Sequence, residues 1–362
     1  MKFRYNDIEC LQVEITTHCN AACIQCPRNN HGKETIASLP LITWSLADAQ
    51  RAIPESFIRQ LRTLFLCGTY GDPMANPAVV EICEWIRQTN PDIELGIHTN
   101  GGIGTTAMYR ALAGCVTYMA FGIDGLEDTN HLYRRRTRWS VIMRNARHFI
   151  STGGQAVWDF LVFAHNQHQV QQAQALSKHM GFARFNVKKT FRFYNRQHEL
   201  IPWIQVDDFQ LRPANDHRYL NHAMTQMPVQ QFRSISHTPD IRCYSLHRKH
   251  LYIAADGKVF PCGWLHDRLY GIEAEQHPDH SEILRMIDQV GGADQITAFR
   301  QPIESIVNGA WFELIAQGWP QSRLERCEVI CGQGRSMRTE QNSEIGYVTE
   351  SHRSDFLNTP AV

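Results

Sequence analysis

The sequence predicts an α/β protein: an open partial (β/α)6 barrel followed by a small C-terminal α+β unit. Three observations favour this class. Six apolar, strand-like runs alternate with helical patterns up to about residue 190, as in parallel sheets with right-handed crossovers. The alternation stops near residue 195, and a hairpin signature follows near residue 250. The length of 362 residues suits one large domain and one smaller domain.

The six strand-like runs are short and apolar. They are Leu11–Ile15, Thr63–Leu66, Glu94–His98, Tyr118–Ile123, Trp158–Phe163 and Phe185–Lys188. Six strands are enough for an open barrel and too few for a closed eight-stranded one. In both architectures the functional groups are expected at the carboxyl ends of the strands.

Two of the intervening helices have clear boundaries. Asn76 is an expected N-cap with Pro77 at the first helical position, and this helix is predicted to run to about Thr89. A second helix is predicted from about Asn166 to Gly181, a typical C-terminal stop. Its expected apolar face consists of Val170, Ala173, Leu176 and Met180.

The domain organisation follows from the change of pattern. We expect the barrel over residues 1–195, a linker over 196–241, the smaller unit over 242–335 and a tail over 336–362. The linker mixes prolines with polar and aromatic residues, which suits a segment crossing a surface. The smaller unit opens with an expected hairpin, in which Lys249–Ala254 and Lys258–Cys262 flank the turn Ala255-Asp256-Gly257.

Composition and charge exclude several classes of protein. Hydrophobic residues make up 43% and charged residues 20%, which is ordinary for a folded protein and not for a disordered one. Lys+Arg and Asp+Glu are both 36, so the excess of cations that a polyanion-binding protein needs is absent, and we expect no nucleic-acid partner. No apolar run has the length of a membrane span, and the first ten residues lack the apolar part of a signal peptide. We expect a cytoplasmic protein without a membrane partner.

The eleven cysteines are the most informative residues. An odd number in a reducing compartment argues against a disulfide framework. Seven fall into two sets with ligand-like spacing. The other four stand alone, and for most of them a buried, packing role is expected; they are Cys10, Cys67, Cys83 and Cys115.

The first set follows the first predicted strand directly. Cys19, Cys23 and Cys26 have the spacing C-x3-C-x2-C on a loop at the carboxyl end of that strand. Three thiolates can hold three irons of a [4Fe–4S] cube and leave the fourth iron open to another ligand. The alternatives are chance clustering or a zinc loop completed by His18 or His31.

With this motif the sequence resembles the radical S-adenosylmethionine (SAM) superfamily, and in particular its SPASM/twitch subgroup; the resemblance covers most of residues 8–335. It implies a [4Fe–4S] cluster on the three cysteines, whose open iron binds the amino and carboxylate groups of SAM. An electron from the cluster would cleave SAM to a 5′-deoxyadenosyl radical, which abstracts hydrogen from a substrate. It also implies a reducing partner such as flavodoxin or ferredoxin.

Further strand-end motifs match the superfamily in order. The resemblance implies SAM contacts from the turn after the second strand, where the acidic end suits the SAM ammonium group, and from the ends of later strands. These candidates are Gly68, Thr69, Tyr70, Gly71, Asp72, Thr99, Asn100, Gly122, Asp124, Arg134 and Asn166. The sequence departs from the family at two positions: Gln25 replaces the usual aromatic residue, and Gly122 replaces a serine.

The second cysteine set lies in the predicted smaller unit. Its spacing resembles that of the auxiliary-cluster domain of the subgroup. The motif consists of Cys243-x13-Gly257-x4-Cys262 and, later in the chain, Cys327-x3-Cys331. A full SPASM domain has seven cysteines and two clusters. The four here are enough for one fully ligated [4Fe–4S] cluster, as in the shorter twitch domain. A structural zinc site on the same four cysteines is the alternative.

These features predict an enzyme, with radical oxidation of a small polar molecule as the favoured reaction. A fully ligated second cluster can accept the electron left on a substrate radical, and related twitch enzymes that oxidise aminocyclitols provide the analogy. The alternatives are radical modification of a peptide, modification of RNA, and a non-enzymatic metal or electron carrier. Substrate contacts could come from the end of the sixth strand, where Lys188, Lys189, Arg192 and Tyr194 either face the barrel mouth or form a solvated basic turn.

Overall fold

The computed structural model describes residues 2–190, 192–193, 201–220, 240–271, 274–321 and 323–332. The chain divides into two compact units. The first unit comprises Met1–Cys19, Thr35–Ile97 and Ser236–Ser336. The second comprises Asn20–Glu34, His98–Ile235 and Met337–Val362.

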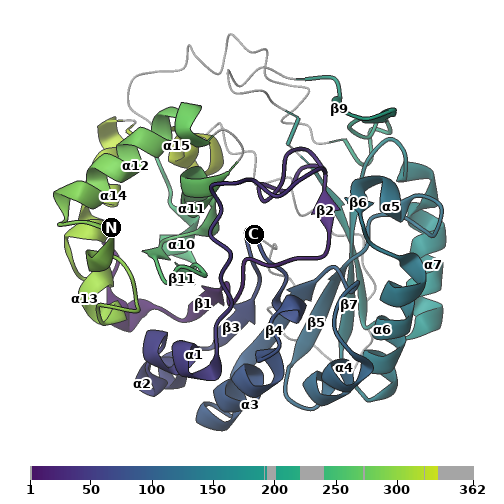
Figure 1. Cartoon of the computed structure of the whole chain (residues 1–362), viewed down its shortest axis with the longest axis horizontal. Helices are drawn as coiled ribbons and strands as arrows, with labels where there is room; N and C mark the ends of the chain where they lie inside the picture. The colour runs from purple at the N-terminus through teal and green to yellow at the C-terminus, as the bar shows by residue number, and fades with distance from the viewer. Residues whose placement is uncertain are drawn as a thin grey trace. The chain divides into compact units, whose positions relative to one another are not determined.

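The sheet of the first unit is centred on β1 (Cys10–Val13), which lies between two parallel neighbours. On one side are β3 (Thr63–Leu66) and then β4 (Glu94–Thr99), both parallel to it. On the other side is β11 (His250–Ile253), also parallel, followed by the antiparallel β12 (Val259–Phe260) (Figure 1). Every residue of β1, β3 and β11 is buried, as expected for parallel strands covered on both faces.

The helices of the first unit come from both ends of the chain. The N-terminal ones are α1 (Leu46–Ala52), α2 (Glu55–Gln60) and α3 (Val79–Thr89). The C-terminal ones are α10 (Tyr244–His247), α11 (Gly263–Tyr270), α12 (Pro278–Gln289), α13 (Ile303–Val307), α14 (Ala310–Gly318) and α15 (Glu325–Cys331). Helix α3 begins two residues later than predicted. The Asn76 side-chain amide donates to the carbonyl oxygens of Ile15 and Trp44, and its side-chain oxygen accepts the Ala78 amide.

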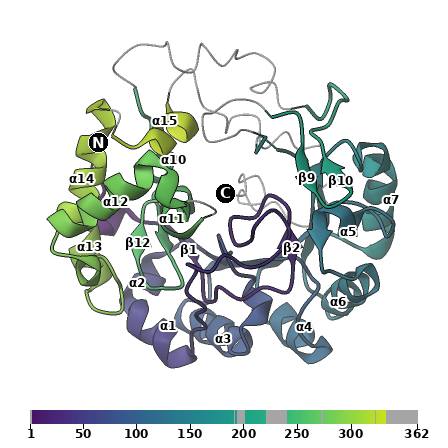
Figure 2. The same ribbon diagram turned by 45° about the horizontal axis from the view of Figure 1, so that its top comes forward.

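The second unit contains the parallel strands β5 (Tyr118–Gly122), β7 (Ala156–Val162) and β8 (Arg184–Lys189). Its helices are α4 (Thr106–Ala113), α5 (Asn130–Tyr133), α6 (Trp139–Ser151) and α7 (Val170–Met180). Two short antiparallel pairs complete it. They are β2 (Ala22–Cys23) with β6 (Arg134–Arg135) (Figure 1), and β9 (Ile204–Val206) with β10 (Phe209–Leu211) (Figure 2).

The predicted α/β class is confirmed. All six predicted strands are present as β1, β3, β4, β5, β7 and β8, each within two residues of its expected boundaries. Among the described strands, β12 pairs only with β11 and β8 only with β7, so the sheet does not close through either of them. Helix α7 ends at Gly181 with a φ of 86°, as predicted, although Ser177 rather than Leu176 is buried on its inner face.

The C-terminal hairpin is also confirmed, at Gly257. This residue has a φ of 79°, and a Cβ there would lie 2.4 Å from the Phe299 ring, so only glycine fits. The parallel pairing of β11 with β1 was not predicted, nor was the β9–β10 hairpin inside the expected linker. The domain boundaries stay a prediction. The expected tail, residues 336–362, lies outside the described residues.

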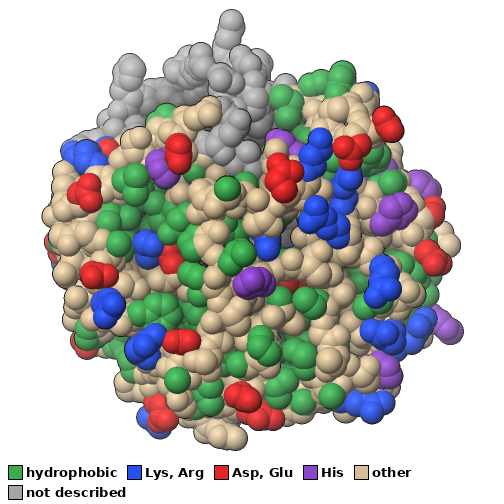
Figure 3. All heavy atoms as spheres, in the orientation of Figure 1, with side chains coloured by type: hydrophobic (Ala, Val, Ile, Leu, Met, Phe, Trp, Pro, Cys, Tyr) green, Lys and Arg blue, Asp and Glu red, His purple; other side chains and the backbone are tan. Residues whose placement is uncertain are grey.

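Charged side chains of both signs are interspersed over the face drawn in Figure 3, in keeping with the net charge of zero. No helix in the described part of the chain combines the length and apolarity needed to cross a bilayer. Three of the four solitary cysteines are buried as expected, namely Cys10, Cys83 and Cys115. Burial raises the pKa of Cys10 to about 12, which leaves it an inert thiol.

Candidate functional site

Two cysteines of the first motif lie on one tight turn of the second unit. Cys23 belongs to β2 and pairs with Arg134 of β6. The Cys26 amide donates to the Cys23 carbonyl oxygen (3.0 Å), and so does the Asn29 side-chain amide (3.1 Å). Both thiols are partly exposed and can reach a ligand. Cys19, in the first unit, is also partly exposed.

A fixed cation lies beside the Cys23 sulfur. Arg134 Nη1 is 3.9 Å from Cys23 Sγ, and Arg134 Nε forms an ion pair of 2.7 Å with Asp124 Oδ2. Burial alone would lower the pKa of Arg134, but Asp124 and Cys23 hold that pKa above its usual value. The permanent positive charge favours the thiolate form of Cys23, which is the form that binds metal.

Asp124 is held rigidly for this contact. Its Oδ1 accepts the Leu161 amide at 2.7 Å, and its carbonyl oxygen accepts the Asn166 side-chain amide at 3.0 Å. The second amide hydrogen of Asn166 goes to the Leu161 carbonyl oxygen (2.9 Å), and Asn166 is fully buried. The structure therefore gives Asn166 a role in positioning Asp124, with both amide hydrogens used for backbone contacts.

The departure from the family at Gly122 has a steric cause. A Cβ at this position would lie 2.3 Å from Arg134 Nη2, well inside van der Waals contact. The space that a serine side chain would fill is taken by the guanidinium group. Gly122 thus permits the ion pair between Arg134 and Asp124.

Gln25, the other residue that departs from the family, links the cysteine loop to the chain after β8 through its side chain. Gln25 Nε2 donates to the Arg192 carbonyl oxygen (2.8 Å), and its Oε1 accepts the Thr190 hydroxyl (3.1 Å). Arg192 Nη1 returns a bond of 3.1 Å to the Gln25 carbonyl oxygen. Arg192, one of the expected substrate contacts, is therefore tied to the loop; Tyr194 lies outside the described residues.

The β9–β10 hairpin covers the same loop. It contributes to a buried apolar cluster against which Cys23 packs, made of Ile24, Tyr133, Phe163, Phe193, Ile204, Val206 and Leu211. Asp207, in the hairpin turn, forms an ion pair of 2.7 Å with Arg135 of β6. Packing of Cys23 against this cluster supports the loop.

The predicted segment at the end of β4 is joined to the cysteine loop by side-chain amides. Asn100 Nδ2 donates to Asn20 Oδ1 (2.9 Å), and Asn100 Oδ1 accepts the Gly102 amide (2.7 Å). Thr99 Oγ1 accepts the Gly101 amide (3.0 Å). Thr99 and Asn100 thus shape the turn directly after the strand and anchor the residue that follows Cys19.

The predicted SAM turn, residues 68–72, lies in the first unit and is tightly packed. A Cβ on Gly71 would lie only 1.7 Å from the Thr16 carbonyl oxygen, so glycine is required there. The amides of Tyr70 and Gly71 donate to Glu14 Oε1 at 2.6 and 2.8 Å. Sequence reasoning missed Glu14, although an acidic residue inside the apolar run 11–15 is a visible signal.

Asp72 is the last residue of this turn and the N-cap of the short helix that follows. Its carboxylate Oδ1 accepts the Met74 amide (3.0 Å) and caps the 3₁₀ helix Pro73–Ala75, while its own amide donates to the His18 carbonyl oxygen (2.9 Å). Asp72 is nearly fully buried. The residue predicted to receive the SAM ammonium therefore also has a local structural role.

The side chains of Tyr70 and Thr69 point toward C-terminal residues of the same unit. The buried Tyr70 ring packs edge-on against His266 and Tyr270, with centroids 5.8 and 6.2 Å away. Thr69 Oγ1 is 3.2 Å from the Tyr252 hydroxyl. A SAM contact from Tyr70 would have to come from its backbone.

The four cysteines of the second set come together within the first unit. Burial and the nearby Cys331 and Cys262 thiols raise the pKa of Cys243 above its usual value. Burial and the other three thiols raise the pKa of Cys327 in the same way. These electrostatic effects indicate that Cys243 and Cys327 lie within interaction range of the other thiols of the set.

The backbone explains how cysteines so distant in sequence meet. Ile241 and Gly332 form a β-bridge, and the Arg242 amide donates to the Cys331 carbonyl oxygen (3.1 Å), so the ends of the segment are joined. Asp279 of α12 accepts the amides of Glu325 and Arg326, both at 2.8 Å, and so caps the helix that carries Cys327 and Cys331. Burial raises the pKa of Asp279 to about 7.

The donor sets can be compared with the groups they are expected to hold. Among the described residues, no group of three or more His, Cys, Asp or Glu is arranged to hold a single metal ion. Both predicted sites offer thiols, the donors typical of iron–sulfur clusters, and cysteines around a cube stand farther apart than ligands around one ion. The donor chemistry fits a [4Fe–4S] cluster at each site.

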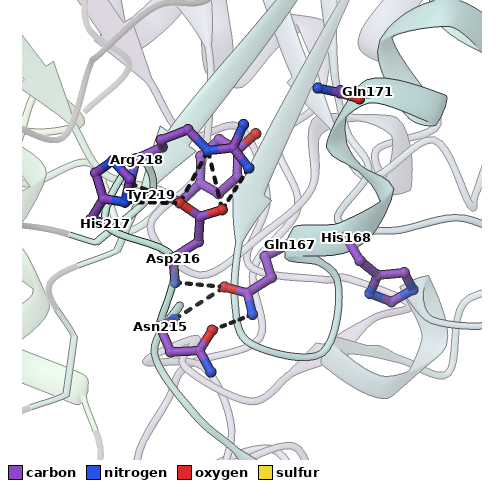
Figure 4. A pocket seen from close by; sticks show the side chains of 8 residues that line it. All are labelled: Gln167, His168, Gln171, Asn215, Asp216, His217, Arg218 and Tyr219. Carbon is purple, nitrogen blue, oxygen red and sulfur yellow. Dashed lines mark hydrogen bonds and ion pairs between the residues drawn. The ribbon is translucent and has the colours of Figure 1, made fainter.

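A separate surface cavity of about 670 Å³ lies in the second unit, at the start of α7 (Figure 4). Several of its polar groups are paired with one another (Figure 4). Gln167 Oε1 accepts the amides of Asn215 (3.1 Å) and Asp216 (3.0 Å), and Arg218 pairs with Asp216 at 2.6 Å. None of the predicted site residues lines this cavity.

Comparisons with known proteins identify a family domain and similar folds. Residues 13–172 match the model of the Radical SAM superfamily. A search of curated proteins found no match. The fold is similar to SuiB from Streptococcus suis, with a TM-score of 0.53 at 12% identity over 87% of this chain and 68% of SuiB. The structure of SuiB bound to its precursor peptide SuiA gives 0.50 at 12% identity over 89% and 77%.

A third SuiB structure, bound to SAM, aligns with a TM-score of 0.48 at 13% identity over 73% of this chain. In that alignment the matched part is 61% of the length of SuiB, less than two thirds. At these identities the likeness concerns the fold. The chain therefore carries a radical SAM superfamily domain over residues 13–172, on an α/β fold that is similar to that of SuiB.

Proposed function

We propose that this protein is a radical SAM enzyme that binds a [4Fe–4S] cluster through Cys19, Cys23 and Cys26. The radical SAM domain, together with the Arg134 cation beside Cys23, is the observation that carries the proposal. The bound cluster supplies, in its reduced form, the electron that cleaves SAM to a 5′-deoxyadenosyl radical, which takes hydrogen from the substrate.

The chain's own residues bind and orient SAM. In the first unit, the turn Gly68, Thr69, Tyr70, Gly71 and Asp72 offers closely packed backbone and one carboxylate, which suit the SAM ammonium group. In the second unit, the proposed contacts are Thr99, Asn100, Gly122, Asp124 and Arg134, with Asn166 supporting Asp124. A buried ion pair such as Asp124–Arg134 keeps its geometry when a charged ligand arrives.

We further propose a second [4Fe–4S] cluster on Cys243, Cys262, Cys327 and Cys331, which would make the C-terminal segment a twitch-type domain. Four thiols near one another support full ligation, with no open iron. A fully ligated cluster can accept the electron left on a substrate radical, which favours an oxidoreductase. Zinc on the same thiols is the competing assignment.

A polar cluster on the second unit's sheet supports a small polar substrate. Asp159 Oδ2 pairs with Lys188 Nζ at 2.6 Å, and its Oδ1 accepts the Asn186 amide at 2.9 Å. Burial would raise the pKa of Asp159, but Lys188 and His98 hold it below its usual value. His98 in turn lies 3.3 Å from the Tyr118 hydroxyl.

The placement of this cluster suits substrate binding. Asp159 is in register with Gly122, at the strand end where the proposed SAM residues begin. The neighbouring Trp158 and Phe185 pack together on the opposite face of the sheet. The side chains of Asp159 and Lys188 keep 14% and 18% of their surface exposed, so a hydroxyl or amine group can reach them.

A peptide substrate is the competing class, because the fold is similar to SuiB in complex with the precursor peptide SuiA. RNA is less favoured, since the net charge is zero. We also propose flavodoxin or ferredoxin as the electron donor and a cytoplasmic location, where a reducing environment keeps thiols available for clusters.

The decisive experiment is a SAM-cleavage assay on anaerobically reconstituted, chemically reduced protein. We expect 5′-deoxyadenosine, formed faster when the right substrate from a panel of aminocyclitols, amino alcohols and short peptides is added. Acceleration by a small polar compound that is weakened in Lys188→Gln supports the favoured substrate class, whereas acceleration by peptides alone supports the alternative. Iron-loaded protein that forms no 5′-deoxyadenosine would contradict the proposed function.

A further inference from the structure

Glu14 is a buried carboxylate that links the SAM turn to the C-terminal part of the first unit. It is only 1% exposed. Its Oε1 accepts the amides of Tyr70 and Gly71, and its Oε2 accepts the Tyr252 hydroxyl at 2.8 Å. Burial raises the pKa of Glu14, and both the charge interaction with His266 and these three hydrogen bonds counteract that rise. A carboxylate in this position requires all its donors, because a buried charge without them is costly.

Tyr252 brings the C-terminal segment into this arrangement. It lies on β11, in register with Gln12 of β1, and is fully buried. Its hydroxyl lies between Glu14 and Thr69, 2.8 Å from the first and 3.2 Å from the second. Tyr252 therefore contacts the turn directly at the Thr69 side chain, and it supports the backbone of the turn indirectly, through Glu14.

The cysteine segment itself contacts the turn. Gly263 follows Cys262 directly, and a Cβ on Gly263 would lie 2.7 Å from Thr69 Oγ1 and 3.4 Å from the Tyr252 ring. The backbone next to a proposed ligand of the second cluster thus packs closely against a proposed SAM-binding residue. The Tyr70 ring adds a further contact, since it packs against His266 of α11.

We propose that Glu14 and Tyr252 are positioning residues that couple the SAM turn to the Cys262 segment, so that SAM affinity depends on the C-terminal cysteine site. The SAM part of this inference rests on the proposed function; the link itself rests on the contacts above. Because coupling between two sites is reciprocal, bound SAM must also stabilise the Cys262 segment.

The test compares two conservative variants of the reconstituted full-length protein. Tyr252→Phe removes the hydroxyl that reaches Glu14 and Thr69. The matched control is Tyr270→Phe, which removes a hydroxyl bonded to Asp256 and Lys258 of the same unit and keeps the ring beside Tyr70. We expect Tyr252→Phe to weaken SAM binding about five- to tenfold by calorimetry, and Tyr270→Phe to change it less than about twofold.

Hydrogen exchange provides a readout that does not depend on SAM chemistry. The amides of Tyr70 and Gly71, which donate to Glu14, should exchange about tenfold faster in Tyr252→Phe than in the wild type and Tyr270→Phe. In the wild type, added SAM should slow exchange across residues 259–266. Equal exchange of the turn in all three proteins would overturn the link.

A second variant tests the packing of the Cys262 segment against the turn. Gly263→Ala places a methyl group against Thr69, and we expect weaker SAM binding with unchanged iron content. Unchanged SAM affinity in both Gly263→Ala and Tyr252→Phe would overturn the coupling. If the wild type binds no SAM at all, the proposed function fails instead, and the exchange comparison still decides whether Tyr252 and Glu14 hold the turn.

Discussion

The two cysteine sites differ in how the chain assembles them. Cys19, Cys23 and Cys26 lie within one loop after β1, so their spacing alone predicts a shared ligand. The four C-terminal cysteines extend from residue 243 to residue 331 and meet through the β11–β12 hairpin, the Ile241–Gly332 bridge and the capping of α15 by Asp279. The first site is a local motif, whereas the second is a product of tertiary structure.

The electrostatic surroundings of the two sites differ as well. Cys23 has the Arg134 cation as a neighbour, which favours its thiolate without any metal. The C-terminal thiols raise the pKa of one another, so a bound metal must take the place of their protons. We therefore expect the first site to govern SAM chemistry and the second to be coupled more strongly to folding of its segment.

The largest expected effect is at the local motif. Cys23→Ala removes one of three ligands, and we expect complete loss of 5′-deoxyadenosine formation while the fold survives, because the hairpin and apolar cluster around the loop remain. The measurement is SAM cleavage per chain under reducing conditions. Cys83→Ala, at a solitary buried cysteine, is the control and should retain cleavage. Wild-type cleavage by Cys23→Ala would refute the ligand assignment.

The next effect concerns Asp72, where capping and ligand binding must be separated. Asp72→Asn keeps an oxygen to accept the Met74 amide but removes the charge proposed for the SAM ammonium group. A charge-assisted hydrogen bond contributes about 1.5–3 kcal/mol, so SAM affinity should fall about tenfold or more, with little change in melting temperature. An unchanged affinity by calorimetry would leave Asp72 with its capping role alone.

A smaller effect tests the packing behind the first site. Gly122→Ala places a methyl group where Arg134 lies, and overpacking of this kind costs about 1–3 kcal/mol. Gly114→Ala is the matched control, because it has ordinary φ and a nearest contact of 3.4 Å. Thermal or chemical denaturation should show the loss only at residue 122. Equal stability of the two variants would mean that Gly122 has no steric role.

The last effect is a pH dependence in the second unit's polar cluster. Burial lowers the pKa of His98 to about 4 from its ordinary 6.5. The unfolded chain therefore takes up a proton first as the pH falls, and stability is lost between about pH 6.5 and 4, by at most about 1.4 kcal/mol per pH unit. His98→Gln should flatten that dependence, whereas His179→Gln, at an exposed position, should not. Identical slopes in wild type and His98→Gln would contradict the burial argument.

The features that the sequence predicts well are those that depend on residues close together in the chain. Short apolar runs predicted β1, β3, β4, β5, β7 and β8, and the hairpin turn at Gly257 predicted β11–β12, because each of these depends on neighbouring residues. The pairing of β11 with β1 joins segments more than 230 residues apart, and no local signal specifies which strand a parallel neighbour will be. The β9–β10 hairpin was hidden by the prolines and polar residues of its surroundings.

The candidate site shows the same division. Cysteine spacing and strand-end turns identified the residues, but the partners of those residues came only from the fold. Glu14 belongs to an apolar strand run, and nothing local indicates that its carboxylate holds the Tyr70 and Gly71 amides. Asn166 was expected to contact SAM, and the fold adds that its side-chain amide donates to the backbone carbonyl oxygens of Asp124 and Leu161.

The central claim is that both cysteine sets hold [4Fe–4S] clusters, and iron content with Mössbauer spectroscopy of anaerobically prepared protein tests it most directly. We expect about eight irons per chain in the wild type, all in [4Fe–4S] form. Cys327→Ala/Cys331→Ala should hold about half of that iron, keep SAM cleavage uncoupled from substrate oxidation, and bind SAM more weakly through the Tyr252 link. A double variant that keeps all its iron, or zinc at the C-terminal site of the wild type, would contradict the account.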